Sequence, residues 1–163
     1  MVPQRGFPAE EFADRTRRCQ AEMDERGIAA ILVTTEPEVR YFTGFHTPFW
    51  QSPTRPWFTV IPASGKPVAI IPSIGRASMA ATWIDDIRTW SSPQPDDDGV
   101  TLLVDCLREL SAGGRIGMPM GPETHVRMPL RDLDRVRAAV GGLTDVTGIV
   151  SGLRMVKSEL EID

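Results

Sequence analysis

The chain has 163 residues, a formal net charge of −4, 25% charged residues and 41% hydrophobic residues. This length suits one domain, or a little more than one, with a core of its own. The acidic balance argues against a nucleic-acid partner, which favours a basic surface, and no apolar run reaches the ~18 residues that a membrane span requires.

The first third of the sequence predicts a helix, a buried strand and a short helical turn. Phe12, Thr16, Cys19 and Met23 recur at spacings of three and four, which indicates one buried face of a helix that ends near Arg26. The run 28–33 is apolar without alternation, so we expect a strand that is covered on both faces. Pro37 suits the first turn of a short helix, where its missing N–H is no loss.

Aromatic residues concentrate in the stretch 39–62. This stretch holds two of the four tryptophans, the only tyrosine and four of the six phenylalanines. Its first part carries turn residues and prolines, whereas Trp57 to Ile61 is a β-branched and aromatic run between two prolines, which is typical of a strand. We therefore expect a ring-rich loop that leads into a buried strand, and loops on rigid scaffolds often carry binding residues.

The remaining sequence alternates between strand and helix patterns. A turn at 63–67 and a strand at 68–71 predict an antiparallel hairpin with the strand before them. We then expect helices over 74–82, 100–110 and 129–140, strands over 84–90, 115–118 and 143–146, and a last amphipathic helix from Ile149. This alternation predicts an α/β fold with a mixed, partly parallel and partly antiparallel sheet and helices on both faces.

The usual catalytic signatures are absent from the sequence. The two histidines, His46 and His125, stand apart from any cluster of metal-ligating residues. The adjacent pair Asp85-Asp86 points to opposite faces of a strand, and the acidic run 96–98 is typical of a solvated loop. The glycines of 114–121 match neither phosphate-binding pattern, and no nucleophile elbow is visible. We therefore expect no metal site in this chain, whereas the sequence leaves a Ser/His/Asp or Cys/His triad open.

Candidate binding residues lie in the aromatic stretch, and each has a structural alternative. Trp57 most often fills a core in such a context, and His46 is more often a hydrogen-bonded loop residue. Phe49, Trp50 and Arg55 lie among prolines, where there is less core to fill. Trp and Arg are favoured at interface hot spots, rings can cage cations, and Arg binds carboxylates through two hydrogen bonds. Packing and ligand contact both stay open for these residues.

Four motifs follow one another over nearly the whole chain. They are Gly27 to Val33, the run Val39-Arg40-Tyr41-Phe42-Thr43-Gly44-Phe45, the strand opening Arg55-Pro56-Trp57, and the tail from Leu153 to Ile162. In the order and spacing of these motifs the chain resembles the N-terminal domain of the creatinase/prolidase superfamily, which includes Xaa-Pro dipeptidases, aminopeptidase P and creatinase. The tail resembles the helix that links to the catalytic domain in that family.

The resemblance implies a ribonuclease H-like sheet of about six strands over residues 1–150, with 151–163 opening a linker to a C-terminal catalytic domain. That absent domain would hold two divalent metal ions (manganese, cobalt or zinc) and carry out hydrolysis. The chain itself would be non-catalytic. It would contribute dimerisation and substrate access, with Arg55, Trp50, His46 and Trp57 as substrate-contact candidates, in some members acting in trans.

Three partners follow from the same resemblance: the catalytic domain, a second copy of the chain, and a small peptide or small-molecule substrate. Pro53 falls near the place of an aromatic residue that reaches substrate in creatinase-like members, with Trp50 the nearest ring, and this departure argues against a creatine-type substrate. One alternative is a superfamily hydrolase or lyase that acts on a small cationic or sulfonium substrate. A stand-alone binding module is another.

We expect a cytoplasmic protein. The first residues lack the apolar core of a signal peptide. The two cysteines, Cys19 and Cys106, lie outside any CxxC pattern and on apolar positions of expected helices, where cysteine behaves as a small hydrophobic residue.

Overall fold

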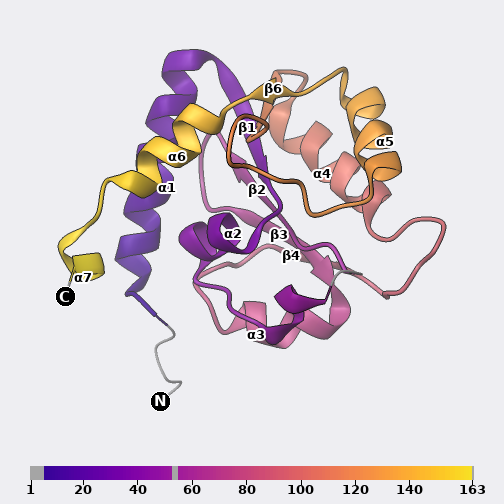
Figure 1. Cartoon of the computed structure of the whole chain (residues 1–163), viewed down its shortest axis with the longest axis horizontal. Helices are drawn as coiled ribbons and strands as arrows, with labels where there is room; N and C mark the ends of the chain where they lie inside the picture. Colours follow the sequence, from indigo (N-terminus) through magenta and orange to yellow (C-terminus); the bar gives the residue numbers. More distant parts are fainter. Residues whose placement is uncertain (1–5, 53–54, 163) are drawn as a thin grey trace.

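The computed structural model describes residues 6–52 and 55–162. These residues form one six-stranded sheet in the order β4-β3-β2-β1-β5-β6, with helices on both of its faces (Figure 1). Pro53, compared above with an aromatic position, lies outside the described residues.

The strands are β1 (Ile28–Val33), β2 (Phe58–Pro62), β3 (Val68–Pro72), β4 (Ile87–Trp90), β5 (Arg115–Met118) and β6 (Thr144–Asp145). The helices are α1 (Ala9–Arg26), α2 (Glu36–Thr43), α3 (Arg76–Ala80), α4 (Val100–Ser111), α5 (Leu130–Val140), α6 (Thr147–Met155) and α7 (Glu159–Ile162), with short 3-10 turns η1 (Pro48–Gln51) and η2 (Ser73–Gly75).

The mixed sheet confirms the fold class predicted from the sequence. Strand β2 pairs antiparallel with both β1 and β3, and the β2–β3 pair is the expected hairpin, with Phe58 opposite Ile70. The pairs β1–β5, β3–β4 and β5–β6 are parallel. The central position of β1 explains its near-continuous apolar sequence, because both of its faces are covered.

Two hydrophobic cores lie on the two faces of the sheet. Val33, Ile61 and Ile71 point to the face covered by α1, α2 and α6. The neighbouring residues in each strand, such as Leu32 and Val60, point to the face covered by α4 and α5. This alternation along each strand is the two-residue period of β structure. Figure 1 shows α1 and α6 side by side on one face and α4 and α5 together on the other.

Helix ends are fixed by local sequence. Gly27 adopts a left-handed conformation, with φ of 61°, and its N–H bonds the last carbonyls of α1. Thr35 and Glu38 form a capping box at the start of α2, where the Thr35 hydroxyl donates to the Glu38 carboxylate at 2.6 Å. These ends place α2, and the aromatic stretch that follows it, at the end of β1.

Three sequence expectations differ from the structure. The helix expected over 74–82 ends with α3, and the strand expected from Ile84 begins at Ile87, because Thr82 forms a turn between them. Its hydroxyl donates to the Met79 carbonyl at 2.7 Å and accepts from the Ile84 N–H at 3.3 Å, a local bond that competes with regular structure. The last helix is not continuous either, because Val156 is extended.

The division of the chain at residue 150 stays a prediction. Residue 150 lies within α6. No helix in the described residues has both the length and the apolar character needed to cross a membrane.

Candidate functional site

Four aromatic rings pack together in residues 45–52 and 55–57, which we call the aromatic loop. The ring of Trp57 lies at the centre of the group and is 0% exposed. Trp50 is 8% exposed, whereas Phe49 is 37% exposed. The ring centroids of Phe45, Trp50 and Phe49 lie 5.3, 6.0 and 6.4 Å from that of Trp57. The interior rings therefore form a rigid base for one exposed ring, Phe49.

Close packing of Trp57 depends on a glycine in η2. A Cβ atom added at Gly75 would lie 2.3 Å from the Trp57 ring, closer than any van der Waals contact allows. The start of η1 is fixed by Thr47, whose hydroxyl accepts a hydrogen bond from the Phe49 N–H at 3.3 Å. The Thr47 cap and the absence of a side chain at Gly75 together determine the position of the exposed Phe49 ring.

Arg127, in the segment between β5 and α5, holds the aromatic loop in place. Its guanidinium donates hydrogen bonds to the carbonyls of Phe49 at 3.3 Å and Trp50 at 3.4 Å, and to those of Ser52 and Arg55. It also lies 5.0 Å from the centroid of the Trp50 ring. Its backbone N–H bonds the hydroxyl of Thr34 at 3.2 Å, at the end of β1. Arg127 therefore joins the loop to the centre of the sheet, with its side chain bound to the loop and its backbone N–H bound to Thr34.

The sequence did not single out Arg127. Burial lowers its pKa from the ordinary value of 12.5, and the charge of Glu36 opposes that shift. No sequence pattern indicates the partners of an isolated arginine in a loop. The acceptors here are backbone carbonyls, which every residue type carries.

Arg55 lies at the exposed end of the same group. Its guanidinium carbon is 5.9 Å from the centroid of the Phe49 ring, and the residue is half-buried. The structure therefore brings Arg55, Trp50 and Trp57 into one group, although Trp57, expected as the first residue of a strand, lies just before β2. Trp57 packs against the other rings of the loop. Direct contact of Arg55, Trp50 or Trp57 with a ligand stays a prediction.

His46 lies apart from these three residues. Its side chain is 60% exposed, and its Nε2 atom is 3.8 Å from the Glu36 carboxylate. It lines a cavity of about 660 Å³, whose lining in the described residues includes none of Trp50, Arg55 and Trp57. A role in substrate contact stays a prediction for His46 as well.

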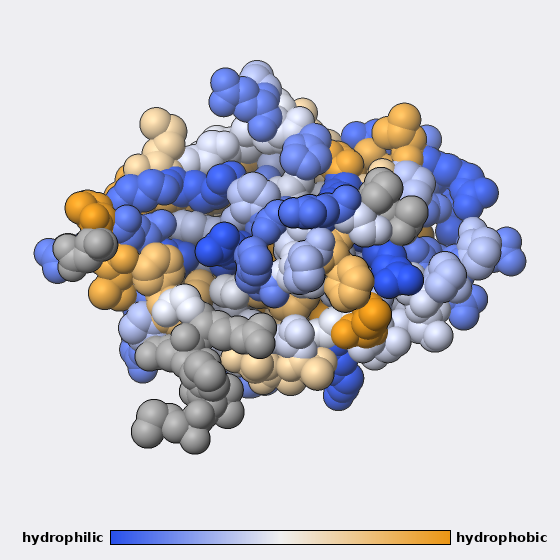
Figure 2. Space-filling view, turned by 60° about the horizontal axis from the view of Figure 1, so that its bottom comes forward, coloured by the Kyte–Doolittle hydropathy of each residue, from blue (hydrophilic) through white to orange (hydrophobic). Residues whose placement is uncertain are grey.

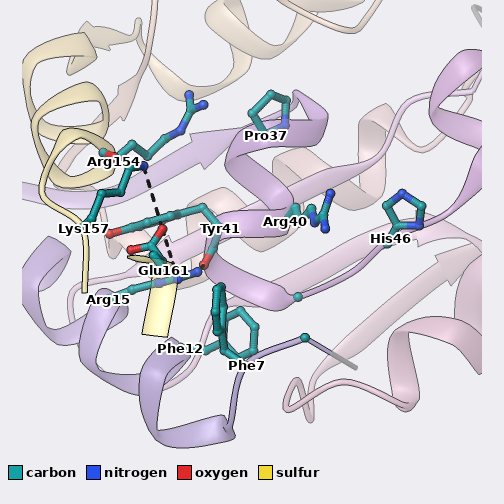
Figure 3. A pocket seen from close by; sticks show the side chains of 12 residues that line it. Phe7, Phe12, Arg15, Pro37, Arg40, Tyr41, His46, Arg154, Lys157 and Glu161 are labelled. Carbon is teal, nitrogen blue, oxygen red and sulfur yellow. Dashed lines mark hydrogen bonds and ion pairs between the residues drawn. The ribbon is translucent and has the colours of Figure 1, made fainter. Parts of the chain in front are cut away.

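The cavity lies between the N-terminal part of α1, helix α2 and the segment that joins α6 to α7 (Figure 3). In Figure 3, Arg154 and Lys157 lie on one side, Arg40 and His46 on the other, and Tyr41 and Glu161 between them. The rings of Phe7 and Phe12 form another part of the wall. A volume of this size is in the range that holds small-molecule ligands.

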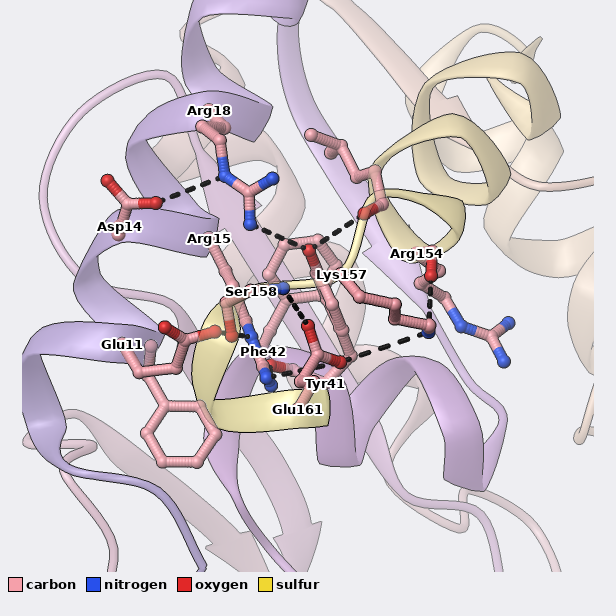
Figure 4. Close-up of polar contacts among 12 residues, drawn as sticks. Glu11, Asp14, Arg15, Arg18, Tyr41, Phe42, Arg154, Lys157, Ser158 and Glu161 are labelled. Carbon is pink, nitrogen blue, oxygen red and sulfur yellow. Dashed lines mark hydrogen bonds and ion pairs between the residues drawn. The ribbon is translucent and has the colours of Figure 1, made fainter. Parts of the chain in front are cut away.

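Buried polar contacts form the base of the cavity (Figure 4). Arg15, with 3% of its side chain exposed, pairs with Glu11 at 2.9 Å and donates to the Tyr41 carbonyl at 3.0 Å. The Tyr41 hydroxyl donates to the Leu153 carbonyl at 3.1 Å and accepts from Arg18 at 3.3 Å. Burial raises the pKa of Tyr41, while the charges of Arg18 and Arg15 act to lower it. This network joins α1, α2 and α6.

Groups suited to covalent or metal catalysis do not gather in residues 6–52 and 55–162. No three His, Cys, Asp or Glu side chains there lie in an arrangement that would hold a metal ion. Both cysteines are buried, as the sequence predicted, and burial raises the pKa of Cys19 and of Cys106 to about 12. Neither thiol is therefore an activated nucleophile.

Exposed apolar side chains concentrate near the end of the described chain. On the face drawn in Figure 2, hydrophilic residues predominate and apolar residues form small separate groups. Four of the large exposed apolar residues lie within 155–162: Met155, Val156, Leu160 and Ile162. The segment that follows α6 therefore presents apolar surface that the described residues leave uncovered.

Comparison with known proteins decides the family. The model of the creatinase/prolidase N-terminal domain matches residues 15–156. The chain belongs to this family. A probable dipeptidase, PepE, of Mycobacterium tuberculosis is 26% identical to it over 160 residues, which cover 98% of the chain and 40% of the relative.

Solved structures of dipeptidases share the fold. The crystal structure of dipeptidase PepE from Mycobacterium ulcerans matches with a TM-score of 0.72 and 24% identity, over 97% of this chain and 40% of that one. That of a prolidase from Thermococcus sibiricus matches with a TM-score of 0.74 and 19% identity, over 93% and 39%. The chain thus spans about 40% of the length of these relatives.

Proposed function

We propose that this family member is the non-catalytic N-terminal domain of a metal-dependent hydrolase of the Xaa-Pro dipeptidase or aminopeptidase P type. The observation that carries the proposal is the family match together with its coverage: nearly all of this chain aligns with about 40% of a probable dipeptidase. The described residues offer no metal-ligating cluster. The two divalent metal ions and the chemistry they supply are accordingly assigned to a further, C-terminal domain.

The apolar end of the chain supports contact with that further domain. Met155, Val156, Leu160 and Ile162 are exposed within one short segment, and exposed apolar groups gathered in one place mark interaction surfaces. Residues 151–163 would act as the linker between the domains. Homodimerisation and a cytoplasmic location complete the proposal; the first is supported by family resemblance, and the second by two free, buried cysteines.

The aromatic loop would narrow the entrance to the active site and contribute to substrate recognition. Arg55 is the side chain best placed to bind a substrate carboxylate, because it lies at the exposed end of the loop and a guanidinium binds carboxylates through two hydrogen bonds. The Phe49 ring lies beside Arg55 and packs against Trp57, whereas His46 lines the cavity described above. Loops that position substrate and exclude water contribute to rate without carrying a reactive group.

The contacts of the loop favour a peptide over a small cationic or sulfonium substrate. An onium cage requires open ring faces. Here Arg55 lies over Phe49 and Arg127 lies over Trp50, so positive charge already sits at these rings and would repel a cationic ligand.

An assay of the 163-residue chain beside its parent protein tests the proposal. Both would be incubated with Xaa-Pro dipeptides and manganese, and with small sulfonium and quaternary ammonium compounds. We expect the parent to hydrolyse the dipeptides and the chain to hydrolyse nothing. Turnover by the purified chain would refute the non-catalytic assignment. Turnover of an onium compound by the parent, without peptide hydrolysis, would replace the first function with the alternative.

A further inference from the structure

The cavity between α1, α2 and α7 has an unusual charge for this molecule. The chain carries a net charge of −4, yet the cavity lining contains four cationic side chains and a single acidic one, Glu161. The cations are Arg15, Arg40, Arg154 and Lys157. Positive charge collected in one concave place on an acidic protein raises the local concentration of anions.

Arg15 is the deepest of these cations, and its hydrogen bonds are incomplete. Its side chain is 3% exposed, and its Nη2 atom has no hydrogen-bond partner in the described residues. The Glu161 carboxylate lies 3.4 Å from that atom, longer than the 2.7–2.9 Å typical of a charge-assisted hydrogen bond. A buried donor without an acceptor is costly, so this atom has the capacity to bind one more anionic oxygen.

The cations nearer the rim are also available. The side chains of Arg40 and Arg154 make no hydrogen bond or ion pair with any described residue. Lys157 donates to the Arg154 carbonyl at 2.6 Å and lies 3.9 Å from Glu161. Figure 3 shows Arg40 and Arg154 on two sides of the cavity. An anion between them would therefore meet charge from two directions.

Aromatic side chains form another part of the cavity wall and indicate that its ligand also has an apolar part. The guanidinium carbon of Arg15 lies 4.7 Å from the ring centroid of Phe7, 5.4 Å from that of Phe12 and 4.5 Å from that of Tyr41. Phe7, Phe12 and Tyr41 all line the cavity. An apolar or aromatic group would pack against these rings, while its charged oxygens face the arginines.

We propose that this cavity is a binding site for a small organic anion that joins an aromatic or apolar group to a phosphate or a pair of carboxylates. The anionic oxygens bind Arg15, Arg40 and Arg154, and the apolar part packs against Phe7 and Phe12. Glu161 of α7 competes for Arg15, so binding draws Arg15 away from α7. The site contains none of Trp50, Arg55 and Trp57 and does not depend on the hydrolase activity proposed above.

An NMR titration of the 163-residue chain tests this site. Phenyl phosphate and phthalate are the two anionic probes, benzyl alcohol is the neutral control and benzylammonium the cationic control. We expect both anions to shift the amide signals of Gly44 and Lys157 saturably, with a Kd on the order of 1 mM, as suits a ligand of about ten heavy atoms. Tighter binding of phenyl phosphate would identify an organic phosphate as the ligand, and tighter binding of phthalate a dicarboxylate.

Substitutions of opposite expected sign make the test specific. Arg40→Gln and Arg154→Gln should each weaken phenyl phosphate binding about two- to fivefold, the range of an exposed ion pair. Glu161→Gln should strengthen binding by a similar factor, because it removes the competing carboxylate from Arg15. Arg131→Gln is the matched control: this exposed arginine lies on α5, which covers the other face of the sheet, and binding should not change.

Three results would overturn the proposal. They are a lack of saturable shifts with either anion well above the expected Kd, equal shifts with benzylammonium, and an Arg131→Gln effect as large as that of Arg40→Gln. Because Arg40, Arg154 and Glu161 lie at or near the surface, their substitution should leave the thermal midpoint close to that of the unmodified chain, which a melting curve would verify.

Discussion

Two arginines, Arg127 and Arg15, hold two regions of this protein together in different ways. Arg127 donates to four backbone carbonyls of the aromatic loop. Arg15 lies among three rings, pairs with Glu11, and has one nitrogen without a hydrogen-bond acceptor. The first arginine donates to several fixed carbonyls, whereas the second keeps one nitrogen that lies 3.4 Å from Glu161 without a hydrogen-bond acceptor among the described residues. The difference distinguishes a structural clamp from a place where a ligand can bind.

Replacing the clamp should have the largest effect on stability. Arg127→Met removes every donor to the loop carbonyls, and we expect the free energy of unfolding to fall by about 2–3 kcal/mol. The free energy of unfolding of Arg127→Lys should lie between that of Arg127→Met and that of the unmodified chain, because an ammonium group cannot span four carbonyls. Urea unfolding measures both, with Arg131→Met as the control. A loss as small as that of the control would show that the carbonyl contacts do not hold the loop.

Gly75→Ala should disturb the same region from the other side. The new methyl group would lie 2.3 Å from the buried Trp57 ring, and we expect a loss of about 1–3 kcal/mol from overpacking. Tryptophan fluorescence should change with it, since the ring must move. Gly148→Ala, in α6, is the matched control: nothing lies within 4 Å of its added methyl group, and it should stabilise the helix by about 0.5–1 kcal/mol. Equal effects of the two changes would contradict the packing described for Trp57.

Replacing the Arg15–Glu11 pair with two methionines should cost less than Arg127→Met, although Arg15 is the more buried residue. Methionine at position 15 keeps the contact with Phe7, Phe12 and Tyr41, and an apolar pair often replaces a buried ion pair at little cost. We expect the double variant Arg15→Met, Glu11→Met to lose about 1 kcal/mol, from the Tyr41 carbonyl and Glu161 left without Arg15 as a partner, in the same urea experiment. A loss larger than that of Arg127→Met would reverse the comparison between the two arginines.

A pH effect at the start of α6 should be the smallest. Asp145 accepts hydrogen bonds from the N–H and hydroxyl of Thr147, at 2.9 and 2.6 Å, and from the Met120 N–H at 3.0 Å. These bonds, the Thr147 hydroxyl first, lower the pKa of Asp145 below 3.8. Its stabilising contribution is therefore complete above pH 3.8 and is lost as the pH falls through the lower, folded-state pKa.

The matched variant for this effect is Asp145→Asn. Between pH 5 and pH 3 its free energy of unfolding should fall less steeply than that of the unmodified chain, as followed by circular dichroism. Parallel curves for the two proteins would mean that the Asp145 carboxylate contributes nothing to acid sensitivity.

Local patterns in the sequence were sufficient for the fold. The apolar run of β1, the hairpin after Trp57 and the helical spacing of Phe12, Cys19 and Met23 each report burial within one element, and the structure confirms them. The aromatic loop was also predictable, because its rings and prolines are contiguous. The early end of α3 was not, since it depends on one hydroxyl, that of Thr82.

The candidate sites were less predictable, because their partners are distant in sequence. Arg127 and Arg55 are 72 positions apart, and the bond between them ends on a backbone carbonyl that any residue would supply. The cavity is built from α1, α2 and α7, and Tyr41 reaches Leu153 across 112 positions. His46 belongs to the aromatic loop in sequence, yet it lines that cavity. No spacing rule reports such contacts.

The most direct measurement is steady-state hydrolysis of a Xaa-Pro dipeptide by the parent protein with Arg55→Gln, beside the Arg131→Gln control. A domain that lends substrate-binding groups to an active site elsewhere should lose about tenfold or more in kcat/KM, mainly through KM, because one charge-assisted contact to the substrate is removed. The control should match the unmodified enzyme. Unchanged kcat/KM in Arg55→Gln would contradict the role assigned to the aromatic loop.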